Sequence, residues 1–272
     1  MSTAEQAGRQ AQALARRAAD HPALDRLARV GLACRGVLYA LIGVLAVQIA
    51  LDGGKEQADK GGAIAAVASL PFGEVILWIM VVGFVALALW QGTEALFGGL
   101  KTADRAEAAF RTGVYVLVSI TLLTMLLAGK ATSDDKKSQD VTAKLLELPG
   151  GQLIVGLIGL AVIGLGVYWV HSGIKKKFLE ELELGRMSPR ARSVMERLGM
   201  AGYIARGAIA GLAGIFVVQA AITFDPDKAG GMDHTLRAFA GTPVGPWLLV
   251  LIALGLLLFA GYCFGESRWR RT

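Results

Sequence analysis

Three arginines lie just inside long apolar segments of this chain, where a charged side chain is unusual. They are Arg35, Arg111 and Arg206, and each is followed by an uncharged run somewhat shorter than the roughly 20 residues that cross a bilayer core. The guanidinium groups must therefore lie at the edge of the hydrocarbon. Ionisable groups at such a depth are costly and often functional, which favours an anion or proton site on the cytoplasmic side. The alternative is that the arginines only anchor helix ends through paired charges.

Glutamates at the ends of later apolar segments are the expected partners of two of these arginines. In a helical hairpin, the start of the first helix lies beside the end of the second. We therefore expect Arg35 to pair with Glu94 and Arg206 to pair with Glu266. Such pairs would hold a charge ring at one end of the protein.

The middle arginine needs a different partner. Ser172 occupies the position that corresponds to the two glutamates, and a serine cannot neutralise a cation. Glu107 lies four residues before Arg111, a spacing that places both side chains on one helix face. We expect an ion pair between them.

A second polar layer lies thirteen residues after each arginine and consists of Gln48, Thr124 and Gln219. At 100° per residue this spacing turns the side chain about 220° past whole turns, so the layer points away from the arginine face. The two layers cannot line one straight pore. We expect hydrogen bonds between helices near the outer end.

The elements that must position these side chains are membrane helices. Hydrophobic residues make up 54% of the 272-residue chain and charged residues only 18%. Six long segments are free of charge and have about the length that crosses a bilayer core. A helix satisfies its backbone hydrogen bonds where water is absent, so the sequence predicts an all-α protein with six transmembrane helices.

The helices form three tandem hairpins. Each Arg-start segment is followed by a short apolar piece and then by a proline and a glycine, at Pro71, Pro149 and Pro243, which open the second helix. This repetition predicts pseudo-threefold symmetry in one compact bundle, with the short pieces along the outer interface. The expected division is a cytoplasmic tail (1–23), repeat 1 (24–98), repeat 2 (101–178), a cytoplasmic linker (179–193) and repeat 3 with a short C-terminal tail (194–272).

Positive charge sets the expected orientation. Most of the 28 Lys and Arg residues lie in the N-terminal tail, in every second loop and after the last helix, which places both termini in the cytoplasm of a bacterial inner membrane. The cations are spread over separate juxtamembrane segments, so their expected partner is the lipid bilayer, and nucleic acid is excluded. The segment from Lys175 to Arg197 is amphipathic and predicts a helix that docks a protein partner or lies on lipid.

Several motifs resemble bacterial membrane proteins of domain of unknown function 1206. They are the recurrent Arg-Gly helix start, the Pro71-Phe72-Gly73 break and the Trp90-Gln91-x-x-Glu94 helix ending, and the resemblance covers about 24–271. The second hairpin departs most, with Thr112 in place of the glycine. The resemblance implies three two-helix domains in a membrane and no established activity.

No enzyme signature accompanies these features. The three histidines are dispersed, at His21, His171 and His234, and neither a metal, a haem, another cofactor nor a catalytic residue is expected. The sequence favours a non-catalytic structural, accessory or docking protein. The alternative is a transporter or channel subunit for a small solute or ion, with the arginines as an anion gate. A membrane enzyme comes third.

Overall fold

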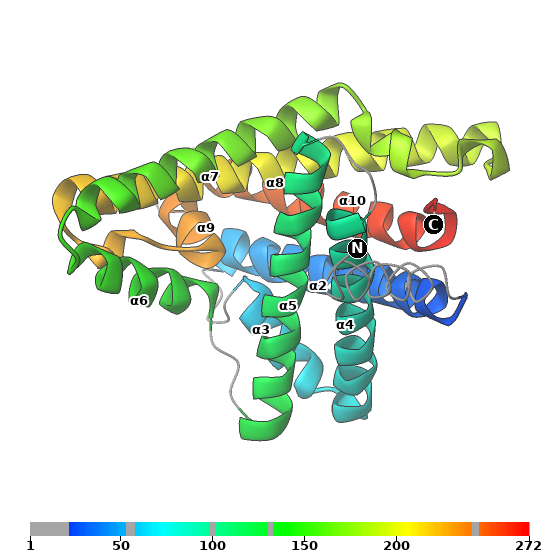
Figure 1. The fold of residues 1–272 in the computed structure, drawn as a ribbon, viewed down its shortest axis with the longest axis horizontal. Helices are drawn as coiled ribbons and strands as arrows, with labels where there is room; N and C mark the ends of the chain where they lie inside the picture. The colour runs from blue at the N-terminus through cyan, green and yellow to red at the C-terminus, as the bar shows by residue number, and fades with distance from the viewer. Residues whose placement is uncertain (1–21, 53–57, 98–101, 130–132, 241–244, 272) are drawn as a thin grey trace, which may run out of the picture.

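The computed structural model describes residues 22–52, 58–97, 102–129, 133–240 and 245–271. Six long helices and three short ones form the described fold (Figure 1). The long helices are α2 (Pro22–Asp52), α4 (Gly73–Phe97), α5 (Thr102–Ala128), α7 (Gly151–Ile174), α8 (Pro189–Thr223) and α10 (Gly245–Trp269). All six are long and apolar enough to cross a membrane, as the sequence predicts. The N-terminal tail up to residue 21 lies outside the described residues.

A short helix precedes the second long helix of each repeat. These helices are α3 (Lys60–Ala68), α6 (Asp134–Leu146) and α9 (Met232–Ala240), and they cover the short apolar pieces expected from the sequence. Three 3-10 turns complete the described elements: η1 (Lys177–Glu181), η2 (Leu184–Arg186) and η3 (Pro226–Lys228).

Close backbone approach explains the proline-x-glycine break. A Cβ atom on Gly73 would lie 2.4 Å from the Val67 carbonyl oxygen, and one on Gly151 would lie 1.9 Å from that of Leu145. The preceding residues, Phe72 and Gly150, are left-handed, with φ values of 62° and 76°. The short helix therefore folds back onto the start of the long one, which only glycine permits.

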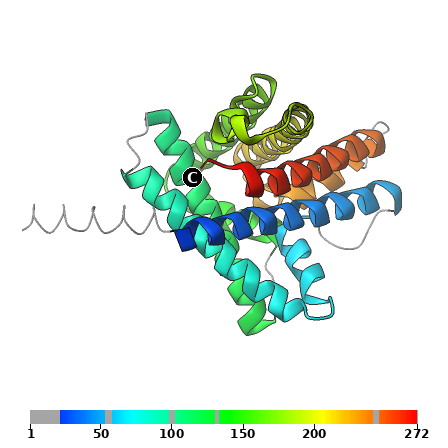
Figure 2. The same cartoon turned by 90° about the vertical axis from the view of Figure 1, so that its right-hand side faces the viewer.

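The three hairpins pack on one another more extensively than the two helices of each hairpin pack together. The most extensive helix contacts are those of α7 with α8, α10 with α2 and α4 with α5. Helices α4 and α5 run side by side across the other four (Figure 1). Figure 2 shows α2 and α10 next to each other. In repeat 2 the start of α5 meets the end of α7, where the Tyr168 hydroxyl donates to Glu107 at 2.7 Å, but farther along a groove of about 490 Å³ lies between the two helices. The physical reason is that α7 packs its glycine face against α8.

Glycines form the seam between α7 and α8. A Cβ atom on Gly166 would lie 2.6 Å from the Gly207 carbonyl oxygen, and one on Gly214 would lie 2.8 Å from that of Gly159. Backbones at this separation leave no room for any side chain. Gly207 therefore serves close packing within the chain, whereas a Cβ atom on Gly211 would meet nothing within 4 Å.

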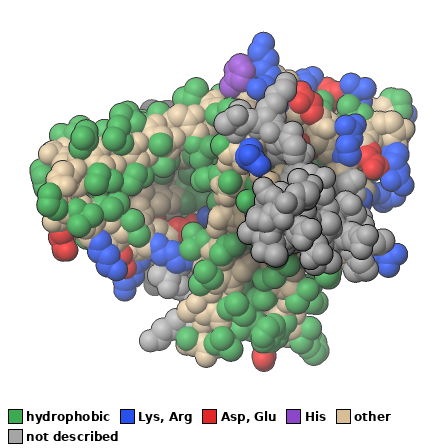
Figure 3. Space-filling view, viewed as in Figure 1, with side chains coloured by type: hydrophobic (Ala, Val, Ile, Leu, Met, Phe, Trp, Pro, Cys, Tyr) green, Lys and Arg blue, Asp and Glu red, His purple; other side chains and the backbone are tan. Residues whose placement is uncertain are grey.

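Hydrophobic side chains cover much of the outer surface of the long helices. Exposed examples are Leu153, Leu251 and Ile222, each at least 65% accessible. Figure 3 shows such side chains over the arm that carries α7 and over the lower lobe, whereas Lys and Arg lie at the opposite end and along the underside of the arm. An apolar surface of this extent is expected of a protein that lies in a membrane.

Aspartates at the starts of the short helices join the three repeats in a ring, which we call the aspartate ring (Asp59, Asp135 and Asp233). Each carboxylate accepts a backbone N–H from the next repeat: Asp59 from Asp134 at 2.6 Å, Asp135 from Gly231 at 2.7 Å and from His234 at 3.0 Å, and Asp233 from Ala58 at 2.8 Å. Burial raises the pKa of Asp59 and Asp135. Because the folded-state pKa values of these two carboxyls are raised, their contribution to the stability of the fold becomes less favourable as the pH rises from acidic to neutral.

Candidate functional site

Six charged side chains alternate in sign across the end of the protein where α2 begins and α10 ends, and we call them the charge ladder. In order they are Glu107, Arg111, Glu181, Arg270, Glu266 and Arg35. The Arg111–Glu181 contact is 2.8 Å and the Arg270–Glu181 contact is 3.1 Å. Three acids balance three arginines, so the ladder carries no net charge.

The predicted pair between Arg35 and Glu94 is wrong. Arg35 forms its ion pair with Glu266 of the third repeat and donates a hydrogen bond to the Tyr115 hydroxyl at 2.8 Å. The reason is that α2 packs more closely on α10 than on α4, so the end of the last helix reaches Arg35 first. Glu94 instead accepts a hydrogen bond from Gln91 at 2.9 Å.

The predicted pair between Arg206 and Glu266 is also wrong. The guanidinium group of Arg206 lies among aromatic rings, with its central carbon 4.3 Å from the Trp169 ring centre and 4.5 Å from that of Phe259. Tyr39 and Tyr203 lie slightly farther away. In the described part of the chain, Arg206 has no carboxylate partner. Cation–π contacts therefore take the place of an ion pair.

The predicted pair between Glu107 and Arg111 is confirmed. Two members of the charge ladder were missed, namely Glu181 and Arg270. Arg270 follows Glu266 by four residues, the spacing that predicted Glu107–Arg111, so the sequence held a signal for it. For Glu181 the sequence held no such signal, because it lies in a linker without helical periodicity, so its neighbours in the fold could not be predicted.

The segment from Lys175 to Arg197 folds back onto the protein through η1 and η2, and it becomes an α-helix only from Pro189, where α8 begins. Phe178 and Leu182 are fully buried against Tyr203 and Tyr262, in the second hydrophobic cluster of the described core. The Glu183 N–H donates to the Trp269 carbonyl at 2.8 Å. The apolar face that predicted a docking or lipid-bound helix is therefore used inside the chain.

Glu181 ties this linker to two arginines of the charge ladder. Burial alone would raise the pKa of Glu181, but Arg111 and Arg270 outweigh it and lower the pKa to about 2. A lowered folded-state pKa means that the contact stabilises the fold above the ordinary glutamate pKa of about 4.3 and weakens as the pH falls toward 2.

We therefore expect a Glu181→Gln variant to be less stable than the wild type by a constant amount from pH 8 to pH 5. Below about pH 4.3 the gap should shrink progressively as the pH falls toward 2, because the unfolded wild type then takes up a proton at Glu181 that the folded wild type, with its lowered pKa, does not. Unfolding in mixed micelles, followed by tryptophan fluorescence across this range, measures the gap. A gap that closes between pH 8 and pH 6 would contradict the pairing.

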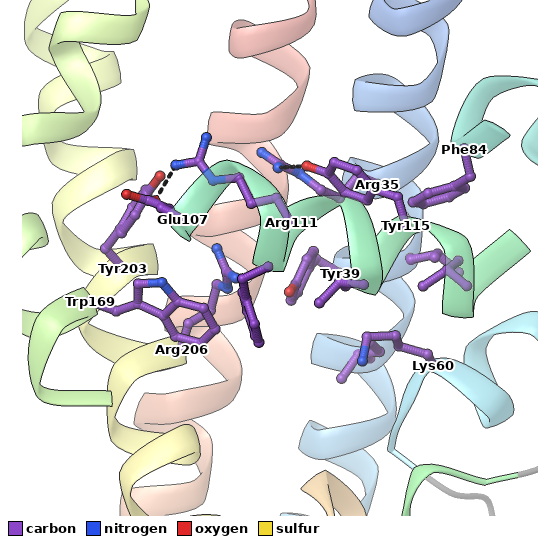
Figure 4. Close-up of a pocket in the computed structure, with 15 residues that line it drawn as sticks. Arg35, Tyr39, Lys60, Phe84, Glu107, Arg111, Tyr115, Trp169, Tyr203 and Arg206 are labelled. Carbon is purple, nitrogen blue, oxygen red and sulfur yellow. Dashed lines mark hydrogen bonds and ion pairs between the residues drawn. The ribbon is translucent and has the colours of Figure 1, made fainter. Parts of the chain in front are cut away.

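All three repeat arginines line one cavity, which we call the central cavity (Figure 4). It has a volume of about 180 Å³, and Arg35, Arg111 and Arg206 reach it from α2, α5 and α8. Apolar side chains form much of the remaining wall: Leu38, Ile42, Phe84, Val114 and Val118. The predicted convergence of the arginines is thus found, although their predicted pairings are not.

A more polar pocket of about 460 Å³ adjoins the central cavity, and we call it the vestibule. The two share Glu107, Arg111 and Tyr203 as lining residues. Ser172 and Arg270 also line the vestibule, and each has a buried polar atom without a hydrogen-bond partner, the Ser172 hydroxyl and the Arg270 Nε. The vestibule offers a polar approach to the arginines.

The outer polar layer does not link helices as expected. Gln48 and Gln219 are exposed, and the Thr124 hydroxyl donates to the Ile120 carbonyl of its own helix at 2.8 Å. The physical reason is that these positions face outward, as the 220° offset from the arginines already implies. Across the described ranges, no three His, Cys, Asp or Glu side chains are grouped so that they could hold a metal ion.

Comparison with known proteins identifies three matching segments. The family model described as Domain of Unknown Function (DUF1206) matches residues 30–98, 106–176 and 201–270. An uncharacterized protein of Bacillus subtilis (strain 168), YxxB, is 28% identical over 248 residues, which cover 89% of each chain. No solved structure matches.

Proposed function

Because the chain belongs to the family called Domain of Unknown Function (DUF1206), whose name assigns no activity, we propose a function from the structure. The protein is a non-catalytic, multi-pass protein of the bacterial inner membrane that binds a small anion in its central cavity, as a transporter or channel subunit does. We prefer this to the docking role favoured by the sequence, because the linker buries Phe178 and Leu182 in the core and the arginines line a cavity.

Both termini lie on the cytoplasmic side in this proposal. The excess of Lys and Arg in the segments on that side supports it. The start of α2 and the end of α10 also lie together, since Arg29 donates to the Arg268 carbonyl at 2.8 Å. The threefold character of the repeats is supported by the arginines around the cavity and by the aspartate ring. The vestibule then opens toward the cytoplasm.

One observation carries the anion proposal. Arg35 and Arg111 are neutralised within the charge ladder, whereas Arg206 lines the cavity and, among the described residues, has cation–π contacts and no carboxylate partner. A guanidinium group that lacks a carboxylate in a partly apolar cavity is a binding site for an anion. The anion would supply the missing negative charge.

Replacement of Arg206 tests the proposal. We expect Arg206→Gln to weaken binding of its anion about 10- to 100-fold, because it removes charge-assisted hydrogen bonds. The full chain, purified in detergent, is screened by calorimetry against inorganic and organic anions, and flux is measured in liposomes. Arg197→Gln is the control, since Arg197 is exposed on the same helix. Failure of every anion to bind, or equal binding by both variants, would refute the proposal.

A further inference from the structure

The central cavity combines its arginines with a largely apolar wall, and Lys60 lies on the side away from Arg206 (Figure 4). From this we propose that its ligand is a small carboxylate with an apolar body about the size of benzoate. The inference rests on the proposed function and names the chemical class of the anion.

Charge balance fixes the number of negative charges on the ligand. Four cationic side chains line the cavity, and three of them have carboxylate partners: Arg35 with Glu266, Arg111 with Glu107 and Glu181, and Lys60 with Asp134 at 3.0 Å. Arg206 alone keeps an uncompensated positive charge within the described lining. A monoanion neutralises the cavity, and a second negative charge would be buried without a partner.

Aromatic rings hold the Arg206 guanidinium group in a defined place. Trp169 and Phe259 lie closest to it, and Figure 4 shows Arg206 extending past Trp169 toward the side that carries Arg111. A planar guanidinium group offers parallel N–H donors that match the two oxygens of a carboxylate. The anionic head of the ligand therefore belongs at this end.

Much of the wall beyond this end is apolar, and Lys60 within it is paired with Asp134. Leu38, Ile42 and Phe84 line it and are almost completely buried, and Val114 and Val118 contribute from α5. An inorganic anion would place its other oxygens against these hydrocarbon groups without hydrogen bonds, which is costly. An apolar body on the ligand fills the same space favourably.

The volume sets the size of that body. The cavity holds about 180 Å³, and an apolar cavity of about 150 Å³ is known to accept benzene. A single six-membered ring or a short branched chain therefore fits, whereas a longer chain does not. The vestibule provides the route to this space from the end that carries the charge ladder.

Four probes separate charge from apolar body. They are benzoate, benzamide as its neutral analogue, acetate as a carboxylate with almost no body, and inorganic phosphate. Binding to the full chain in detergent is measured by calorimetry and by the shift in thermal unfolding. We expect benzoate to bind at least about tenfold more tightly than each of the other three, because only benzoate satisfies Arg206 and fills the cavity.

Two variants locate the ligand. Arg206→Gln should reduce benzoate binding to the level of benzamide, whereas Arg197→Gln should not. Val114→Phe fills part of the cavity and should weaken benzoate about tenfold or more. Val116→Phe is its matched control, because Val116 lies on the same helix, is 44% exposed and does not line the cavity.

The outcomes distinguish this inference from the proposed function. If phosphate or acetate binds as tightly as benzoate and still requires Arg206, the inference fails and the anion function stands. If benzamide binds as tightly as benzoate, or if no probe and no other anion binds, both fail. Equal effects of Val114→Phe and Val116→Phe would place the ligand outside the cavity and overturn the inference.

Discussion

Replacing Glu266 by glutamine should lower the free energy of unfolding by about 3–5 kcal/mol, because it removes one partner of a buried ion pair. Glu266 is 1% exposed and is the only carboxylate in the described structure that contacts both Arg35 and Arg270. Without its charge, the charge ladder has three cations and two anions, and a guanidinium group remains buried and unpaired. Unfolding with SDS in mixed micelles, followed by tryptophan fluorescence, measures the loss.

Glu94→Gln is the matched control, since Glu94 occupies the corresponding position of the first repeat. Its hydrogen bond to Gln91 involves no cation, so the expected loss is about 1 kcal/mol or less. A double variant that also carries Arg35→Gln should lose less than the two single variants together, because it removes the stranded charge. Equal losses at Glu94 and Glu266 would instead support pairing within the hairpin.

Gly166→Ala should destabilise the protein by about 2–3 kcal/mol, because even one methyl group overpacks the seam between α7 and α8. Its Cβ atom would lie 2.6 Å from two backbone atoms, the Gly207 carbonyl oxygen and the Gly211 nitrogen. Backbone atoms cannot rotate away as a side chain can, so the two helices must separate. The same unfolding assay measures the change.

Gly164→Ala on the same helix is the control for this prediction. A Cβ atom at Gly164 meets nothing within 4 Å. The exchange should therefore be neutral or stabilise the helix by up to about 1 kcal/mol, the difference in helix propensity between the two residues. Equal destabilisation at both positions would mean that the two helices do not meet through glycines.

The sequence predicts the helices well because their signals are local. Apolar length marks the six long helices, and Pro71 and Pro149 with their glycines mark where a short helix gives way to a long one. The convergence of three arginines also follows, because each repeat brings its own copy to the same end. The helix positions and the convergence of the arginines can therefore be predicted from a single repeat unit.

The partners of these arginines could not be predicted from the repeat unit. Arg35 meets Glu266 because α2 packs closely on α10, a contact between residues at opposite ends of the chain. Arg206 meets rings from α2, α7 and α10, and Glu181 enters from a linker without periodicity. These contacts depend on how the repeats pack together, which no repeat encodes by itself.

The aspartate ring has a consequence for the order in which the chain assembles. Its last link joins Asp233 to the Ala58 N–H across most of the chain, and α10 then covers α2. A chain emerging from the ribosome therefore inserts its first helix long before the helix that will cover it exists. Contacts of such separation form late, because the intervening chain must first be ordered. Until the third repeat is made, one face of α2 has only lipid or another chain as its neighbour.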